Sequence, residues 1–375
     1  MSDQVSPQDF YEALGHNQID LFTGVPDSLL TDIAGYITDH TPPERHVITA
    51  NEGNAVALAC GYHIATGRYA AVYLQNSGLG NMVNPLLSLA DPDVYSVPML
   101  LIIGWRGEPG VKDEPQHVAQ GRLTLPLLDT MGIAYQVIDP EAWQQQIADA
   151  TETMRQTNRP VALVIRKGTF SKYAVKTRSA DTTLTREQAL EAIIDTIDAA
   201  DFIVSTTGKT SREVFEIRER RGEGHASDFL TVGGMGHASS IAMGMALGTD
   251  RRVYTVDGDG AFLMHLGAAA VAAQQAPNNF RYVLINNGAH ESVGGQPTIG
   301  FDIDIEAILI GAGFTGVTSV TSADAIGPAI AALADAPRTA VVITVAQGSR
   351  ADLGRPTTTA LQNKLDMMAE FGTSS

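Results

Sequence analysis

The chain has 375 residues and a formal net charge of -17 at pH 7, and such a net anion repels nucleic acids and anionic membranes, so we expect neither as a partner. Cys60 is the only cysteine, which excludes an internal disulfide and a multi-cysteine metal site. No apolar segment approaches the ~20 residues of a membrane span and the N-terminus has no signal-peptide pattern, so we expect a cytoplasmic protein with a small-molecule substrate.

Apolar runs of strand length alternate with helical patterns along the chain. Short strands separated by helices predict parallel sheets covered by helices on both faces. The expected strands are residues 70–74, 99–103, 161–165, 202–205, 253–256, 282–285 and 340–345. Residues 172–186 are polar and lack apolar periodicity, so we expect them to form a linker between a first domain (residues 1–178) and a second (residues 187–375).

The two halves resemble each other in sequence. The segment EGNAVALACGYHIATGRYAAVYL, which starts at Glu52, superposes without gaps on MGHASSIAMGMALGTDRRVYTV, which starts at Met235. Matched positions include Gly53 with Gly236, and each segment is a helix of small residues followed by a turn and a strand. A duplication explains this pattern. It predicts an α/β fold with two related, doubly wound parallel-sheet domains and a ligand site between them.

Polar residues follow two of the expected strands in the second half. Asp259 lies in the stretch VDGDGAFLMH, and Asn287 follows the next strand. Because parallel strands end at the same edge of a sheet, we expect these two side chains to lie together. Their oxygens are hard ligands suited to Mg²⁺, while Gly258, Gly260 and the amide of Ala261 offer room and N–H groups for a diphosphate.

A Gly-Asp-Gly motif followed about 25 residues later by Asn-Asn is similar to the signature of thiamine diphosphate enzymes, and the resemblance covers nearly the whole chain. It implies thiamine diphosphate and Mg²⁺ as cofactors, with a pyrimidine-binding first domain and a diphosphate-binding second domain. Asp259, Asn287 and the carbonyl of Ala289 would bind Mg²⁺. Asp257 has no assigned ligand, and we interpret it as a residue that orients the turn.

The resemblance also assigns residues at the duplicated positions. Glu52 would exchange a proton with N1′ of the aminopyrimidine, and its counterpart Met235 would hold the cofactor in a bent conformation. Gly233 would offer its carbonyl to the 4′-amino group. Thr207 and Gly208 are interpreted as a strand-to-helix turn at the diphosphate, because STTGKTSRE lacks the first glycine of a P-loop. A nicotinamide site is rejected because GMGHAS departs from the dinucleotide fingerprint.

Two loops of the first half carry candidate substrate contacts. GVPDS resembles the family loop with a polar active-site residue, so Asp27 or Ser28 would face the substrate; an equally good interpretation makes Asp27 a helix cap. QNSGLGN resembles the loop near the reacting carbon, where Asn76 would contact the substrate. Further candidates are Arg106, Lys112 and His117 in GWRGEPGVKDEPQHVAQGR and His290 and Ser292 in NNGAHESVGGQPT.

These last two loops resemble those of the phosphonopyruvate and sulfopyruvate decarboxylases, a compact branch without a middle domain. Arg106 and Lys112 would bind the second anion of the substrate, and His117, His290 or Asp27 would move protons. Sulfopyruvate enzymes are often split into two subunits, so a fused chain favours conversion of 3-phosphonopyruvate to phosphonoacetaldehyde and CO₂. Sulfopyruvate or another 2-keto acid is the alternative substrate.

Two further expectations follow from the same resemblance. A non-catalytic cofactor binder is disfavoured, because binding alone needs no proton relay at Glu52. Family sites pair the first half of one chain with the second half of another, so we expect a homodimer or a larger homo-oligomer with sites at subunit interfaces.

Overall fold

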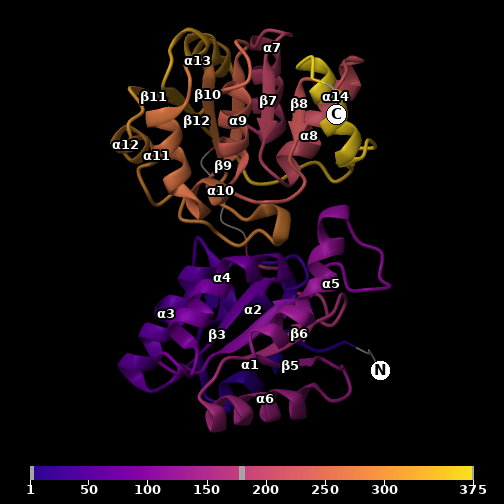
Figure 1. Cartoon of the computed structure of the whole chain (residues 1–375), viewed down its shortest axis with the longest axis vertical. Helices are drawn as coiled ribbons and strands as arrows, with labels where there is room; N and C mark the ends of the chain where they lie inside the picture. Colours follow the sequence, from indigo (N-terminus) through magenta and orange to yellow (C-terminus); the bar gives the residue numbers. More distant parts are fainter. Residues whose placement is uncertain (1–3, 177–181, 374–375) are drawn as a thin grey trace. The chain divides into compact units, whose positions relative to one another are not determined.

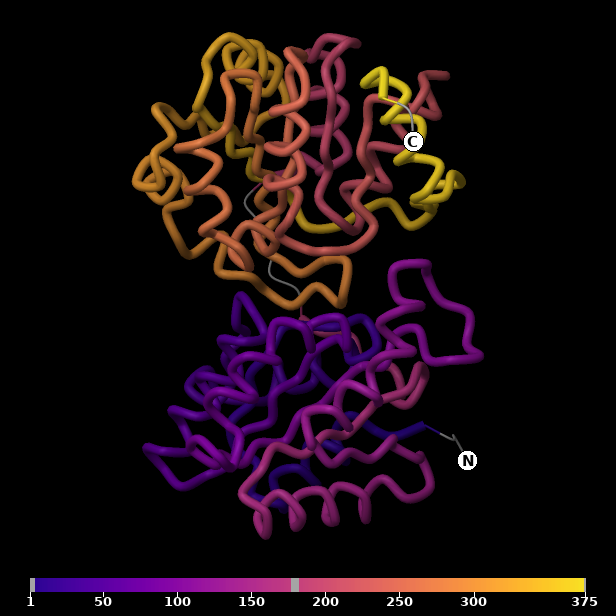
Figure 2. Tube along the Cα trace, in the orientation of Figure 1, coloured from indigo at the N-terminus to yellow at the C-terminus, as the bar shows by residue number. Residues whose placement is uncertain are grey.

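The computed structural model describes residues 4–176 and 182–373. The chain divides into two compact units, which we call unit 1 (Met1–Thr177 with Ser292–Gln296) and unit 2 (Arg178–Glu291 with Pro297–Ser375). Figure 2 traces the chain from indigo at the N-terminus to yellow at the C-terminus. Residues 177–181 of the expected linker lie outside the described residues, and its last residue, Arg186, already begins a helix.

Unit 1 is built on a parallel six-stranded sheet with the strand order β2-β1-β3-β4-β6-β5. Its strands are β1 (Ile19–Gly24), β2 (His46–Ile48), β3 (Tyr69–Gln75), β4 (Leu100–Gly104), β5 (Ala134–Val137) and β6 (Val161–Ile165). Its helices are α1 (Pro7–His16), α2 (Thr31–His40), α3 (Glu52–Thr66), α4 (Leu79–Pro85), α5 (Pro115–Thr130) and α6 (Trp143–Thr157), with the short helices η1 (Pro43–Arg45), η2 (Asn76–Gly78) and η3 (Leu86–Ala90).

Unit 2 has a parallel six-stranded sheet with the order β11-β12-β10-β9-β7-β8. Its strands are β7 (Phe202–Ser205), β8 (Asp228–Leu230), β9 (Val253–Gly258), β10 (Phe280–Asn286), β11 (Gly316–Val320) and β12 (Thr339–Thr344). Its helices are α7 (Arg186–Thr196), α8 (Lys209–Arg221), α9 (Ala238–Ala246), α10 (Asp259–Met264), α11 (Leu266–Gln275), α12 (Ile305–Ala312), α13 (Ala323–Asp335) and α14 (Ala360–Glu370), with the short η4 (Glu291–Val293).

The central strands of each sheet are buried on both faces because they are largely apolar. In β3, Val72 and Leu74 pack into one hydrophobic cluster, whereas Ala71 and Tyr73 pack into another on the opposite face. Successive side chains of a strand point to opposite faces, so a continuous apolar run serves two cores at once. Figure 1 shows helices on both faces of each sheet, which confirms the predicted doubly wound parallel sheets.

The two units share one strand order, which confirms that the two domains are related. Numbered within its own unit, each sheet reads 2-1-3-4-6-5. In both units a helix of small residues, α3 or α9, precedes the third strand, as the sequence match predicts. Within residues 4–176 and 182–373, no helix combines the length and apolar character that a membrane crossing requires.

Candidate active site

The carboxyl edge of the unit 2 sheet brings Asp259 and Asn287 together. Strand β9 ends at Gly258, its neighbour β10 ends at Asn286, and the backbone N–H of Asn287 points to Oδ1 of Asp259 at 3.5 Å. The Thr298 hydroxyl donates to Oδ2 of the same carboxylate. Burial raises the pKa of Asp259 to about 6, although the hydrogen bonds from these donors act to lower it. Among the described residues this buried carboxylate has no basic partner, which suits a cation.

Asp257, two residues earlier, has a different environment. Its Oδ2 accepts from the Tyr282 hydroxyl at 3.2 Å and its Oδ1 accepts from the Gly258 N–H at 3.0 Å. Burial raises its pKa to about 6 as well. Both oxygens therefore brace the turn.

The loop after β10 carries three candidate residues. The Asn287 side chain donates from Nδ2 to Glu291 at 2.8 Å, and its Oδ1 accepts from the Ala289 N–H at 3.2 Å. His290 is buried, and burial lowers the pKa of its imidazole to about 4. A Cβ on Gly260 would lie 3.1 Å from Cε1 of His290 and 3.3 Å from Cε of Met235. The structure thus gathers Met235, Gly260 and His290 around one point.

The donors at this edge fit Mg²⁺. Among the described residues, no group of three or more His, Cys, Asp or Glu side chains is placed to hold a metal ion. A cation here would use the Asp259 carboxylate, the Asn287 amide oxygen and the Ala289 carbonyl. Mg²⁺ accepts few protein ligands and fills its remaining positions with phosphate and water oxygens.

The predicted diphosphate turn lies between β7 and α8. Gly208 has φ of +104°, a conformation that glycine adopts readily, and Thr207 precedes it. The Ser211 hydroxyl, near the start of α8, donates to the carbonyls of Thr206 (2.8 Å) and Thr231 (3.1 Å). This joins the turn to the loop that carries Gly233 and Met235. The sequence did not identify Ser211 as a link between them.

Glu52 is the first residue of α3 in unit 1 and is 5% exposed. Its Oε2 accepts from Nδ2 of Asn81 at 2.7 Å. A Cβ on Gly78 would lie 2.2 Å from its Oε1. The carboxylate therefore occupies a space that exists because residue 78 has no side chain.

Asp27 is fully buried at the carboxyl edge of the unit 1 sheet. It accepts from Nε2 of Gln75 at 2.6 Å and from the Leu29 N–H at 3.0 Å. A Cβ on Gly104 would lie 2.0 Å from its Oδ2. Burial raises the pKa of Asp27, so this carboxyl keeps its proton to a higher pH than an exposed one.

The basic loop of unit 1 contains its own counter-ion. Nε and Nη2 of Arg106 pair with Asp113, the Nε contact being 2.8 Å, and Nη1 donates to the Ser28 hydroxyl at 2.7 Å. Burial raises the pKa of Asp113, but the hydrogen bonds from Arg106 and the Gly107 N–H outweigh it and set the pKa at about 2. Arg106 is thus already neutralised and aimed at Ser28.

The other candidates of unit 1 differ in exposure. Lys112 is exposed, and among the described residues it has no ion-pair or hydrogen-bond partner. Burial and the Arg106 charge lower the pKa of His117 to about 4. Asn76 is 1% exposed and bonds to the Arg106 backbone and Thr124, so the structure gives it a bracing position, and its substrate contact stays a prediction. Ser292 is exposed.

Comparisons with known proteins place the chain in a family. Models of thiamine pyrophosphate enzymes match it twice, with the N-terminal TPP binding domain at residues 7–132 and the C-terminal TPP binding domain at residues 206–345. A phosphonopyruvate decarboxylase of Streptomyces hygroscopicus is 34% identical over 371 residues, covering 94% of this chain and 90% of that protein. The chain belongs to the thiamine pyrophosphate enzymes.

Two more relatives define its position within the thiamine pyrophosphate enzymes. A phosphonopyruvate decarboxylase of Streptomyces viridochromogenes is 36% identical over 356 residues, covering 90% of this chain and 87% of that protein. A sulfopyruvate decarboxylase of Methanosarcina acetivorans is 26% identical over 347 residues, or 86% of each chain. The expected family and its cofactor, thiamine diphosphate, are confirmed.

Some residues that contact the candidate site residues within each unit, directly or through one another, were not identified from the sequence. They are the glycines that make room for carboxylates, the amides that bond to them, and charged residues that form ion pairs in either unit: Gly78, Gly104, Gln75, Asn81, Asp113, Arg186, Glu213 and Glu291. Asn81 lies in QNSGLGN and Glu291 in HESVGGQPT, so the motifs pointed to the loops without indicating which side chains meet.

Proposed function

We propose that this chain is a carboxy-lyase that converts 3-phosphonopyruvate to phosphonoacetaldehyde and CO₂, with thiamine diphosphate and Mg²⁺ as cofactors. The observation that carries the proposal is 34–36% identity to two phosphonopyruvate decarboxylases over at least nine-tenths of the chain. The buried donor set at Asp259 and Asn287 supports Mg²⁺ as the metal.

Each predicted cofactor residue has a proposed task. Mg²⁺ would be held by Asp259, Asn287 and the Ala289 carbonyl, and the diphosphate by Thr207, Gly208, Gly258, Gly260 and Ala261. Gly233 and Met235 would face the cofactor rings. Bound thiamine diphosphate supplies an electron sink for the bond that breaks as CO₂ leaves.

The chain's own residues would manage the protons. Decarboxylation replaces the carboxylate on the keto carbon by a proton, so one proton is consumed per turnover. Glu52 would exchange a proton with the cofactor's aminopyrimidine. Burial raises the pKa of Asp27, which favours its protonated form and supports it as the donor, whereas His117 and His290 have pKa values of about 4 and are neutral near pH 7.

The substrate's phosphonate would lie near the basic loop of unit 1. Arg106 holds its guanidinium on the Ser28 hydroxyl and is neutralised by Asp113, so it offers directed N–H groups more than net charge. Lys112 is a nearby cation without a partner in the part of the chain that the structure describes. Asn76 and Ser292 complete the proposed substrate contacts.

Sulfopyruvate is the second candidate substrate, because the chain is 26% identical to a sulfopyruvate decarboxylase over 86% of that protein. That relative also corrects one step of the sequence interpretation. A fused chain was expected to favour phosphonopyruvate, yet a sulfopyruvate decarboxylase aligns along most of both halves. The higher identity to the phosphonopyruvate enzymes, not chain length, therefore supports the preferred substrate.

One assay tests the proposal. Purified protein with thiamine diphosphate and Mg²⁺ would be offered phosphonopyruvate, sulfopyruvate and pyruvate, with CO₂ and aldehyde measured. We expect the highest kcat/KM for phosphonopyruvate and a loss of turnover in Glu52→Gln. Turnover of none of the three, or full activity in Glu52→Gln, would refute the proposal.

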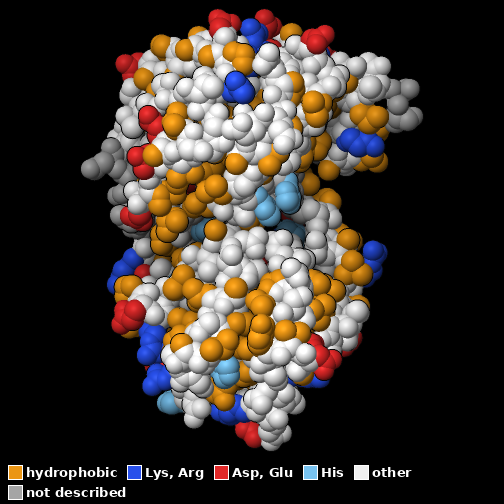
Figure 3. Space-filling model, turned by 60° about the vertical axis from the view of Figure 1, so that its left-hand side comes forward, with side chains coloured by type: hydrophobic (Ala, Val, Ile, Leu, Met, Phe, Trp, Pro, Cys, Tyr) orange, Lys and Arg blue, Asp and Glu red, His pale blue; other side chains and the backbone are white. Residues whose placement is uncertain are grey.

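We also propose a homo-oligomer, located in the cytoplasm, with sites at subunit interfaces. Both units expose large hydrophobic side chains, among them Ile64 (70%), Tyr95 (66%) and Leu247 (67%). Figure 3 shows how widely hydrophobic side chains spread over one face. These side chains are available for contacts between copies, and the proposal itself rests on the resemblance, in which sites pair the first half of one chain with the second half of another.

A further inference from the structure

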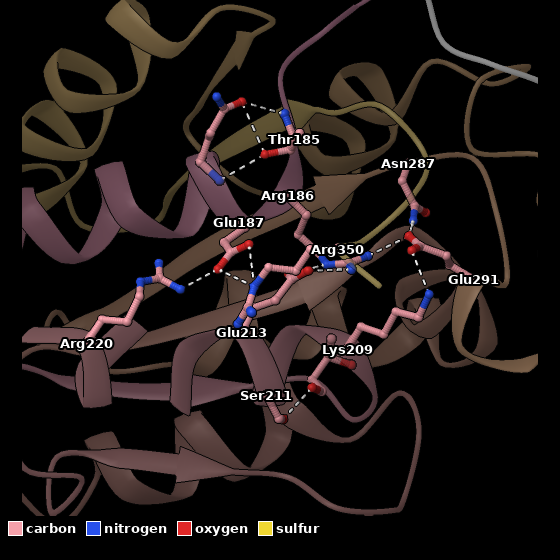
Figure 4. A network of polar contacts seen from close by, with 12 residues as sticks. Thr185, Arg186, Glu187, Lys209, Ser211, Glu213, Arg220, Asn287, Glu291 and Arg350 are labelled. Atoms are coloured by element: carbon pink, nitrogen blue, oxygen red, sulfur yellow. Dashed lines mark hydrogen bonds and ion pairs between the residues drawn. The ribbon is translucent and has the colours of Figure 1, made fainter. Parts of the chain in front are cut away.

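Glu291 accepts three charged or amide donors in unit 2. Its Oε2 accepts from Nη1 of Arg186 at 2.7 Å and from Nδ2 of Asn287 at 2.8 Å, and its Oε1 accepts from Nζ of Lys209 at 2.9 Å. Figure 4 shows these side chains meeting from three parts of the chain, α7, α8 and the loop after β10. One carboxylate therefore contacts the predicted metal ligand and the start of the helix after the diphosphate turn.

Arg186, which donates to the Glu291 carboxylate, is itself held in place by a second carboxylate. Its Nε and Nη2 pair with both oxygens of Glu213 at 2.6 and 2.9 Å, and its side chain is 6% exposed while that of Glu213 is 1% exposed. A bidentate pair at this burial has a fixed geometry. The remaining Nη1 then fixes Glu291, whose side chain is 10% exposed.

The consequence for Asn287 follows from the chemistry of an amide. A carboxylate only accepts hydrogen bonds, so it selects the nitrogen end of the amide. With Nδ2 on Glu291, the oxygen Oδ1 points to the other side, where it accepts one N–H from Ala289 at 3.2 Å. A carbonyl-type oxygen has two lone pairs, so the second remains for a cation.

We infer that Glu291 is a positioning residue for the Mg²⁺ site: it fixes the Asn287 amide so that its oxygen serves as the metal ligand, and it holds Lys209 beside the diphosphate turn. The inference rests on the proposed assignment of Asn287 as a ligand. The four charges of Arg186, Glu213, Glu291 and Lys209 balance, so the network orients the amide without adding net charge near a bound diphosphate.

A purely structural role predicts a different outcome from a positioning role. Glu187 belongs to the same network in Figure 4 and pairs with Arg220 and Arg350. It gives unit 2 comparable ion pairs without touching Asn287. Glu187→Gln is therefore the matched control for Glu291→Gln, since each substitution replaces one carboxylate by a neutral amide and leaves the shape of the side chain nearly unchanged.

The test is Mn²⁺ binding to the full chain with saturating thiamine diphosphate, followed by electron paramagnetic resonance. Mn²⁺ takes the same oxygen ligands as Mg²⁺. Loss of an outer partner of a metal ligand typically weakens binding 10–100-fold, so we expect Glu291→Gln to raise the Kd for Mn²⁺ by about tenfold. Glu187→Gln should stay within about twofold, and thermal unfolding verifies that both variants are folded.

A second variant tests the route through the amide. In Asn287→Asp both side-chain oxygens are equivalent, so the residue needs no orientation. We expect the double variant Asn287→Asp/Glu291→Gln to bind Mn²⁺ more tightly than Glu291→Gln alone.

The outcomes separate this inference from the proposed function. If the wild type binds Mn²⁺, three results would overturn this inference and leave the proposed function standing. They are an unchanged Kd in Glu291→Gln, an equal rise of the Kd in Glu291→Gln and Glu187→Gln, and a double variant that binds Mn²⁺ no more tightly than Glu291→Gln. Wild-type protein that binds no Mn²⁺ with thiamine diphosphate would overturn the metal site itself.

Discussion

At the scale of single residues, the position of Glu52 depends on the absence of a side chain at Gly78. A Cβ there would lie 2.2 Å from Oε1 of Glu52, and Gly78 has an ordinary helical φ of -78°, so alanine would create a steric clash and no backbone strain. We expect Gly78→Ala to displace the carboxylate. Since proton transfer by a positioned group contributes at least about a hundredfold, kcat should fall by about that factor.

Gly80, two residues further, provides the control for this measurement. It is exposed, and a Cβ there would meet nothing within 4 Å. Gly80→Ala should leave kcat within about twofold of wild type. Equal losses in the two variants would contradict the proposed role of the space at Gly78.

His117 predicts a pH dependence of stability. Burial and the Arg106 charge lower its pKa from 6.5 to about 4. Between these values the unfolded chain binds more protons than the folded protein, so stability falls as the pH drops from about 6.5 toward 4. We expect the urea midpoint to fall between pH 7 and pH 5, and to fall less in His117→Gln.

Tryptophan fluorescence can follow this unfolding selectively, because both tryptophans, Trp105 and Trp143, lie in unit 1 with His117. His16 is exposed at the end of α1, and His16→Gln serves as the control. Between pH 7 and pH 5, the urea midpoint of His16→Gln should fall as much as that of the wild type. An equal fall in His117→Gln and wild type would refute the prediction.

Residue types and spacing predicted which residues gather at the carboxyl edge of the unit 2 sheet, but not which charged side chains pair with one another. The Gly-Asp-Gly and Asn-Asn motifs led to Asp259 and Asn287, which lie together as expected. The sequence predicted that Arg106 binds the second anion of the substrate but did not predict that Asp113, seven residues later, pairs with it. Which of several nearby carboxylates meets a given arginine depends on loop geometry, and no spacing rule determines it.

At the scale of elements, we expect a substitution in the turn between β7 and α8 to weaken cofactor binding separately from any general loss of stability. Gly208 at its centre has φ of +104°, where a side chain costs about 1–3 kcal/mol. We expect Gly208→Ala to weaken thiamine diphosphate binding at least about tenfold, which corresponds to about 1.4 kcal/mol. Calorimetric titration with Mg²⁺ present measures it.

The other end of α8 offers a matched substitution. Gly222 caps that helix with φ of +66° and open space around its Cβ position. Gly222→Ala should lower thermal stability by a similar amount and leave the cofactor Kd unchanged. Weakened binding in both variants would indicate a general loss of stability in place of a local effect.

The strands show where sequence patterns predict structure and where they do not. All seven expected apolar runs are interior strands. The sheet edges are β2, β5, β8 and β11, which have three to five residues, and β11 is largely exposed or half-buried. An edge strand needs no continuous apolar run, so its pattern resembles that of a loop.

At the scale of the whole molecule, the proposed pairing of halves from different subunits predicts complementation. Glu52→Gln inactivates a residue of the first half and Asp259→Asn one of the second. In a mixed dimer that carries one variant on each chain, one site would contain both substitutions and the other neither. Co-expression with two affinity tags, followed by purification through both, should give about half of wild-type activity per dimer.

Each variant purified alone is the control and should be inactive. Mixed dimers without activity would show that each site is built from a single chain. Activity in either single variant would instead contradict the role assigned to that residue.

The matching strand orders have an evolutionary consequence. Every strand in each sheet comes from one half of the chain, so a backbone break between β6 and α7 would remove no hydrogen bond from either ladder. We therefore expect a chain divided at that point to keep the strands of both sheets, although Ser292–Gln296 of the second half belong to unit 1. If the halves arose by duplication, each copy was also free to change alone, which accounts for a glutamate at position 52, where we propose proton exchange, and an apolar methionine at its counterpart.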